Sequence, residues 1–205
     1  MTLETAALFV AASALLILVP GPNVALIVAN SLAHGARYGL LTVAGTSAAM
    51  LPQLAMTVAG MSAFVAALAD WFEVLRWLGV AYLVFLGVRA WRAPAVDLTG
   101  VPAEPRSAAA IWARGFAVSL TNPKTLLFYG AFLPQFVDAA APDVTAQLAI
   151  LAALFLATAV LLDSCWALAA ARARPFLAGR GRLRNRITGA LLVGAGAGLA
   201  LARKG

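Results

Sequence analysis

Apolar residues run through this chain in long stretches that short polar segments interrupt. Six stretches are candidates for membrane-spanning helices, namely residues 5–31, 39–69, 74–91, 110–135, 144–171 and 187–202. A helix needs about 20 predominantly apolar residues to cross a bilayer. The first two stretches are longer than this, and both contain proline, so we expect them to tilt, kink or unwind. The pattern predicts an all-α integral membrane protein with six transmembrane helices.

Only one segment between these stretches has the composition of a true linker. Residues 93–107 combine proline, glycine and charged residues, which favour a loop. This linker separates residues 1–92 from residues 108–205, and each part contains three expected spans. Because three is odd, two related halves would lie in opposite orientations, as in many transporters. The sequence therefore predicts a 3+3 inverted repeat.

The basic residues indicate how the chain is oriented in the membrane. Of the 15 Lys and Arg residues, three lie on one side (Arg76, Arg203 and Lys204), and Lys124 lies within the fourth span. The other eleven lie in or beside the connections after the first, third and fifth spans: Arg37, Arg89, Arg92, Arg106, Arg114, Arg172, Arg174, Arg180, Arg182, Arg184 and Arg186. Cytoplasmic connections carry the excess of basic residues. We therefore expect the linker 93–107 to be cytoplasmic and both termini to be periplasmic.

The composition supports a membrane location and argues against other classes. Hydrophobic residues make up 63% of the chain, charged residues 11%, and the mean hydropathy is +0.91; soluble domains are about half apolar and a quarter charged. The pI near 10.8 does not indicate nucleic-acid binding, because the basic residues lie in short runs between apolar stretches. One Cys and one His argue against an intrachain disulfide and a His/Cys metal site. No cofactor is expected.

The first span contains a break. Pro20 and Pro22 each lack a backbone donor and obstruct the preceding helical turn, and Gly21 between them adds backbone freedom. Backbone carbonyls freed in this way are tolerated in a membrane only where they face protein or a wet cavity. Asn23 adds a side-chain donor and acceptor. A structural kink is the plainer interpretation, but two prolines around a glycine favour an unwound binding segment.

The fourth span repeats this chemistry with Asn122, Pro123 and Lys124. Each half of the chain thus begins with a span that an Asn/Pro cluster interrupts. Paired interruptions at matching positions are the best sequence indication of a transporter's binding site. We expect broken helices 1 and 4 to form a transport core.

Two charged residues lie deep within spans. Lys124 is about 15 Å along a helix from Arg114, and Asp163 is about 14 Å from Arg172 on the same side. A charge at such depth costs at least about 3 kcal/mol and is usually functional or paired. We expect Lys124 and Asp163 to share one polar cavity. A purely structural ion pair is the alternative.

Weaker polar and glycine signals complete the candidate site. Thr46, Ser47 and Gln53 lie along the second span, where they are candidates for lining the cavity, although hydroxyls bonded back to the helix are equally expected. Gly194 and Gly198 have the spacing that permits close helix contact, either within the chain or in a homodimer.

These motifs resemble the LysE/RhtB family of amino-acid exporters. The resemblance rests on Pro20-Gly21-Pro22-Asn23 and on Asn122-Pro123-Lys124, the latter followed by Phe132-Leu133-Pro134-Gln135-Phe136-Val137. It implies a bacterial inner-membrane protein that exports amino acids or close derivatives, driven by the proton gradient, with the two motifs as its transport core. Pro52-Gln53 departs from the family pattern.

Three other classes fit less well. A membrane enzyme is not expected, because G-x-S-x-G, H-E-x-x-H and nucleotide-binding motifs are absent from the sequence. A channel would use rings of repeated polar residues. A metal-ion exporter of the wider superfamily would use more acidic or thiolate ligands than Asp163 and Cys165 supply. The expected partners are therefore a small-molecule substrate and the lipid bilayer.

Overall fold

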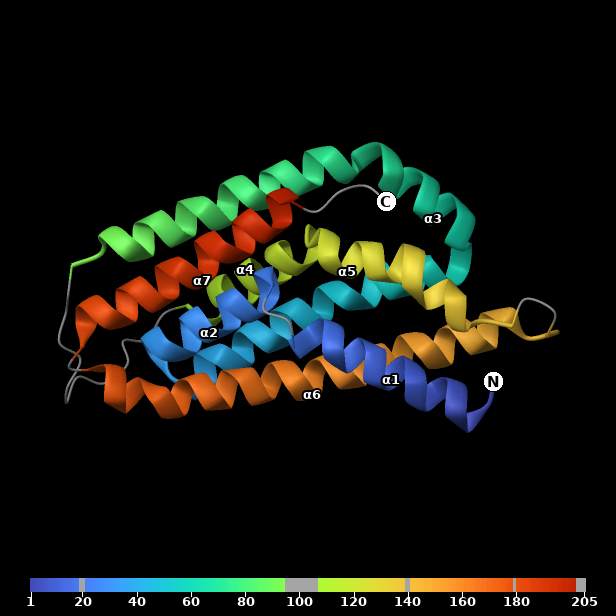
Figure 1. The fold of residues 1–205 in the computed structure, drawn as a ribbon, viewed down its shortest axis with the longest axis horizontal. Coiled ribbons are helices and arrows are strands. Elements are labelled where there is room, and N and C mark those ends of the chain that lie inside the picture. The colour runs from blue at the N-terminus through green and yellow to red at the C-terminus, as the bar shows by residue number, and fades with distance from the viewer. Residues whose placement is uncertain (19–20, 95–106, 139–140, 179, 202–205) are drawn as a thin grey trace.

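A computed structural model describes residues 1–18, 21–94, 107–138, 141–178 and 180–201, and every regular element within these ranges is a helix (Figure 1). The elements are α1 (Leu3–Leu18), α2 (Pro22–His34), α3 (Ala36–Arg92), α4 (Ala108–Leu120), α5 (Pro123–Leu127), the π-helix η1 (Phe128–Phe132), the 3₁₀ helix η2 (Leu133–Phe136), α6 (Val144–Ala178) and α7 (Gly181–Leu201). The helices run roughly along one direction and form an elongated bundle.

The apolar helices fit an all-α membrane protein. Among the described residues, Ala36–Gly60 and Val144–Leu177 are each long and apolar enough to cross a membrane, and the bent pair of α1 and α2 brings the number to three. The sequence predicts six. Two of the remaining stretches fall short for physical reasons: α4 is only 13 residues long, and α7 begins with three arginines between residues 182 and 186, which lower its hydropathy.

The gap between the expected spans 39–69 and 74–91 predicted a turn around Asp70 and Glu73, and this prediction is wrong. The helix α3 continues through both positions, and its non-helical backbone is instead at Gly60, with φ −159° and ψ 60°. A glycine gains more backbone freedom than any other residue and is a common site for such an interruption. The second and third predicted spans therefore meet at Gly60, ten residues earlier than expected.

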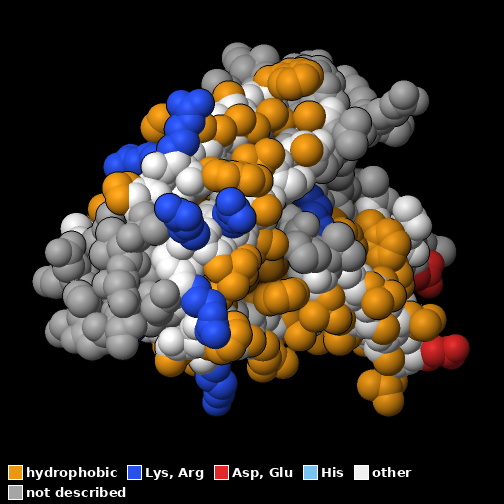
Figure 2. All heavy atoms as spheres, turned by 60° about the vertical axis from the view of Figure 1, so that its left-hand side comes forward, with side chains coloured by type: hydrophobic (Ala, Val, Ile, Leu, Met, Phe, Trp, Pro, Cys, Tyr) orange, Lys and Arg blue, Asp and Glu red, His pale blue; other side chains and the backbone are white. Residues whose placement is uncertain are grey.

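Charge is distributed unevenly between the two ends of the bundle. The ends of α2, α3 and α6 lie together with the starts of α4 and α7 (Figure 1). Figure 2 brings this end forward and shows Lys and Arg side chains gathered on it, whereas Asp and Glu side chains lie at the opposite edge. The connections that carry most of the arginines in sequence are thus grouped in space.

Glycines allow close helix crossings. A Cβ on Gly45 would overlap the carbonyl of Trp112, and a Cβ on Gly115 would lie 2.8 Å from the carbonyl oxygen of Thr42, so α3 and α4 touch through their backbones. Gly45 and Gly115 are therefore packing positions at this crossing. Gly194 instead has nothing within 4 Å and is exposed.

A buried apolar cluster packs around α1, the π-helix η1 and α6. Phe9 and Ile17 lie on one face of α1, and they pack with Phe128, Tyr129 and Phe155. The rings of Phe9 and Phe128 are 5.9 Å apart, and those of Tyr129 and Phe155 are 5.2 Å apart in a T-shaped arrangement. This cluster fixes α1, η1 and α6 around the region between the two helix breaks.

Candidate functional site

The first helix break separates α1 from α2, whose axes differ by 57°. Gly21 is the N-cap of α2 in an extended conformation, and Pro22 follows at the first helical position. Proline suits this position because its missing N–H would have no partner in the helix. Gly21 has no side chain that could cap this N-terminus, so backbone donors of the first turn face the break. Pro20 lies outside the described residues.

The second break separates α4 from α5. The side chain of Asn122 accepts a hydrogen bond from the backbone N–H of Lys124 at 3.1 Å and so caps α5, which begins at Pro123. The hydroxyl of Thr125 donates to the carbonyl of Asn122 at 2.9 Å. The following turn is a π-helix, a form that often marks functional sites. Both breaks thus have proline at the first position of the restarted helix.

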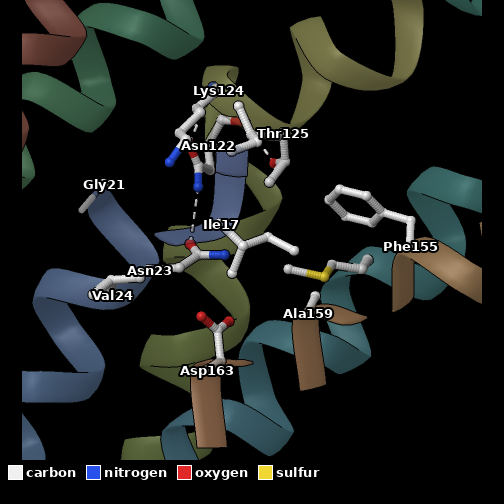
Figure 3. A pocket seen from close by; sticks show the side chains of 12 residues that line it. Ile17, Gly21, Asn23, Val24, Asn122, Lys124, Thr125, Phe155, Ala159 and Asp163 are labelled. Atoms are coloured by element: carbon white, nitrogen blue, oxygen red, sulfur yellow. Dashed lines mark hydrogen bonds between the residues drawn. The ribbon is translucent and has the colours of Figure 1, made fainter. Parts of the chain in front are cut away.

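The two breaks meet in space, although they lie 99 residues apart in the sequence. The Nδ2 group of Asn122 donates to Oδ1 of Asn23 at 3.1 Å (Figure 3). Nδ2 of Asn23 donates in turn to the hydroxyl of Ser119 at 3.2 Å. Both asparagine side chains are buried. Buried amides require partners, and here each break supplies a partner for the other.

A small cavity lies beside this pair of asparagines. Its volume is about 30 Å³. It is lined by Leu16, Ile17, Gly21, Asn23, Val24, Met50, Asn122, Lys124, Thr125, Phe155, Ala159 and Asp163. A water molecule occupies about 30 Å³ in the liquid, so this conformation has no room for an amino acid. Five of the predicted core residues, however, border the same space.

The two charged residues of the predicted core both reach this cavity. Asp163 projects from the middle of α6, is 2% exposed, and its Oδ1 atom has no hydrogen-bond partner among the described residues. Lys124 is half-buried, and its Cδ and Nζ atoms lie 3.1 and 3.5 Å from the position that a Cβ on Gly21 would take. In the view of Figure 3, Asn23 lies between Asp163 and Lys124. The cavity therefore has an acidic group and a basic group on opposite sides of the joined breaks.

Comparison with known proteins identifies the family. The model of the LysE type translocator family matches residues 14–203. A homoserine/homoserine lactone efflux protein of Salmonella typhi is 31% identical over 206 residues, covering 99% of both chains. This chain belongs to the LysE family. The resemblance seen in the sequence motifs is confirmed, and membership places the chain among membrane transporters rather than enzymes.

Other LysE relatives match over shorter lengths. A leucine efflux protein of Klebsiella pneumoniae is 37% identical over 126 residues, which are 60% of this chain and 58% of that protein. A protein of Vibrio cholerae described as a membrane protein is 33% identical over 121 residues, which are 59% of each chain. No solved structure matches.

The candidate cavity-lining residues of the second span have other contacts in this LysE chain. The hydroxyl of Thr46 donates to the carbonyl of Val43 in its own helix at 3.0 Å. Gln53 donates from Nε2 to the carbonyls of Ser119 and Leu120 at 3.2 and 3.0 Å, while its Oε1 is buried without a partner among the described residues. The hydroxyl of Ser47 is likewise buried and unpartnered there. Of the three, Gln53 bonds to the end of α4 beside the break, and none borders the cavity.

Several contributors to the site escaped the sequence analysis. Ser119 and Thr125 lie within the run of polar residues around Asn122. This run was the sequence feature from which their place in the site could have been predicted. Asn30 is seven residues after Asn23, hence on the same helical face, and its Nδ2 donates to the hydroxyl of Thr42 at 2.8 Å. This spacing of two asparagines in an apolar helix was a readable signal that α2 has a polar face toward its neighbours.

Proposed function

We propose that this chain exports amino acids or close derivatives from the bacterial cytoplasm. The observation that carries the proposal is the end-to-end similarity to a homoserine/homoserine lactone efflux protein, together with the hydrogen bond that joins the two helix breaks. Similarity over part of the chain to leucine efflux proteins supports the same substrate class.

The cavity offers complementary groups for a zwitterion. The N-terminus of α2 has no side-chain cap and carries the positive end of a helix dipole. With Lys124 nearby, it suits the carboxylate of an amino acid. Asp163 has a buried oxygen without a partner among the described residues and suits the ammonium group. Charge-assisted hydrogen bonds of this kind are about twice as strong as neutral ones.

Transport requires this cavity to grow, because about 30 Å³ holds only water. We therefore interpret the conformation as a closed one. Broken helices allow one part of a transporter to rock against another around a fixed site. The bend between α1 and α2 is a natural hinge, since residues next to it border the cavity from both sides.

Six spans in an inverted repeat are part of the proposal. The supporting arrangement is that residues 1–92 form a broken pair followed by helical parts on either side of Gly60, and residues 108–205 form a second broken pair followed by α6 and α7. The grouping of arginines at one end supports a cytoplasmic location for that end, with residues 93–107 as a cytoplasmic linker and both termini in the periplasm of a cell with an inner membrane.

Two further elements of the proposal concern coupling and assembly. Proton coupling through Asp163 is consistent with a carboxylate that is 2% exposed at the core. A homodimer through the face of Gly194 is consistent with the exposure of this residue, because small residues let helices of two copies approach closely.

An efflux assay tests the function. Cells that lack their own exporters are loaded with dipeptides, and release of homoserine, leucine, threonine and lysine is compared with and without the protein. We expect release of at least one amino acid. Increased metal tolerance with no amino-acid release would contradict the proposal and favour an ion exporter.

The variant Asp163→Asn tests the coupling role separately. We expect it to remove the pH dependence of export, while Asp143→Asn, the same exchange at an exposed position, leaves it intact. Equal membrane abundance of both variants is required. An unchanged pH dependence in Asp163→Asn would reject proton coupling at this residue, without bearing on the substrate class.

A further inference from the structure

A second, larger cavity lies at the arginine-rich end of the bundle, away from the transport core. Its volume is about 300 Å³, and it is lined by Trp91, Ala93, Arg182, Asn185 and Arg186. Ligand sites in proteins begin at about this size. Its described lining contains two guanidinium groups and no carboxylate. The cavity therefore has the space and the charge to take an anion.

Backbone contacts hold one wall of this cavity in place. The side chain of Asn185 donates from Nδ2 to the carbonyl of Ala93 at 2.9 Å and to that of Pro94 at 3.2 Å. These bonds tie the end of α3 to the start of α7. Because Asn185 lies between Arg182 and Arg186 in sequence, the same bonds fix the turn of α7 that carries both arginines.

An indole ring forms the apolar side of the cavity. Trp91 packs against Gly189, where a Cβ would lie 3.1 Å from Cε3 and 3.2 Å from Cβ of the tryptophan. The Trp91 residue nevertheless remains 52% exposed. Tryptophan is enriched where membrane proteins pass through lipid headgroups, since its ring is apolar and its N–H is polar. This position at the end of a bundle fits that depth.

The charges of the cavity act together. Arg182, Arg186 and Gly189 share one face of α7, as residues spaced by four and three do. The positive end of the helix dipole is in the same turn as Arg182. Guanidinium groups bind phosphate oxygens in pairs of parallel hydrogen bonds. Basic pockets between membrane helices are known to bind lipid headgroups.

We propose that this cavity binds a phosphate-bearing anion, with Arg182 and Arg186 as the phosphate ligands and Trp91 packing beside it. A phospholipid headgroup and a soluble phosphate share this chemistry. The exposed ring of Trp91 favours the lipid, because an acyl chain attached to the phosphate could pack on it.

Native mass spectrometry of the full chain in detergent tests the site. Dioleoyl phosphatidylglycerol is compared with dioleoylglycerol, which has the same chains without the phosphate. We expect the first lipid to bind and the double variant Arg182→Ala/Arg186→Ala to lower its affinity about 10- to 30-fold, from about 1 kcal/mol per basic residue. Binding should weaken with added salt. The double variant Arg182→Gln/Arg186→Gln provides an independent measurement if the first expresses poorly.

The matched control removes the same charge from the same end of the bundle. Arg172→Ala/Arg180→Ala changes two exposed arginines of α6 and its end, and we expect it to retain lipid affinity within about twofold. Inorganic phosphate added as a competitor identifies the source of the anion. Displacement of the lipid at millimolar phosphate supports a soluble occupant of the same site, and no displacement supports the lipid.

Three results would overturn the proposal. The first is equal binding of phosphatidylglycerol to the wild type and to the Arg182/Arg186 variants. The second is an equal loss in the Arg172/Arg180 control, which would mean nonspecific attraction. The third is equal binding of phosphatidylglycerol and dioleoylglycerol to the wild type, which would mean that the phosphate is not recognised.

Discussion

Replacing either asparagine at the helix breaks should destabilise the protein, and replacing both should cost less than the sum. In Asn122→Ala, the cap on the Lys124 N–H is lost, which costs about 1 kcal/mol. The Oδ1 atom of Asn23 also loses its donor while buried, which costs about 1–3 kcal/mol. We expect a total of about 2–4 kcal/mol.

In Asn23→Ala, the Nδ2 group of Asn122 and the hydroxyl of Ser119 both lose a partner. We expect about 2–3 kcal/mol, because two buried polar groups are left but no cap is removed. The free-energy cost of losing the Asn23–Asn122 hydrogen bond is included in the destabilisation of both single variants. The double variant should therefore be more stable than additivity predicts by about 0.6–1.7 kcal/mol, the coupling found for hydrogen bonds between membrane helices.

Unfolding in mixed micelles by added SDS, followed by circular dichroism, measures these free energies. The matched control is Asn30→Ala. Asn30 lies on the same helix as Asn23 but away from the cavity, and the variant loses one buried hydrogen bond to Thr42 of α3. We expect it to lower stability by about 1–2 kcal/mol and to retain export, whereas Asn23→Ala loses export. Full additivity of the Asn23 and Asn122 variants would refute the joined breaks, and normal export by Asn23→Ala would refute their role in transport.

Three further variants test the surroundings of the core. Gly45→Leu should lower stability by at least about 1–3 kcal/mol and reduce membrane abundance, because its side chain would meet backbone rather than a movable side chain. Gly194→Leu lies in open space within the chain and should change the stability of the monomer by less than about 0.5 kcal/mol. Equal effects of the two variants in an unfolding assay would contradict this. Gln53→Leu should lower stability by about 1–3 kcal/mol, since two carbonyls at the end of α4 lose their donor, and unchanged SDS unfolding would show that water replaces it. The charge-free double variant Lys124→Gln/Asp163→Asn should fold but not export, and normal efflux would mean that the two charges are structural only.

The positions of the two breaks were predictable from the sequence because proline acts locally. Pro22 and Pro123 cannot donate a helical hydrogen bond wherever the rest of the chain lies, so each begins a new helix as expected. The turn between the second and third spans was not predictable in the same way. Charged Asp70 and Glu73 interrupt the apolar pattern between the expected spans 39–69 and 74–91, but the helix continues past them and breaks at Gly60. Charge disfavours burial in lipid without breaking hydrogen bonds, whereas a glycine changes the backbone itself.

The bonding partners of the polar groups could not be read from the sequence at all. Gln53 and Thr46 lie on one helix and were equal candidates for lining the cavity. Gln53, however, bonds to α4, whereas Thr46 bonds to its own helix. The difference depends on which face of α3 meets α4. That face is set by the crossing at Gly45, where backbones touch. Such a contact between distant segments has no signature in a single sequence.

The estimate that Lys124 and Asp163 lie at one depth assumed a continuous fourth helix, and the structure has a break there, between α4 and α5. Both residues nevertheless border one cavity. The reason is that Asn122 restarts the helix immediately, with its side chain on the Lys124 N–H, so little axial distance is lost. The same cap ties the position of Lys124 to Asn122, and through it to Asn23. A movement of α2 that carries Asn23 with it would therefore also shift the lysine relative to Asp163 as long as the amide bond holds, and this links opening of the core to its charges.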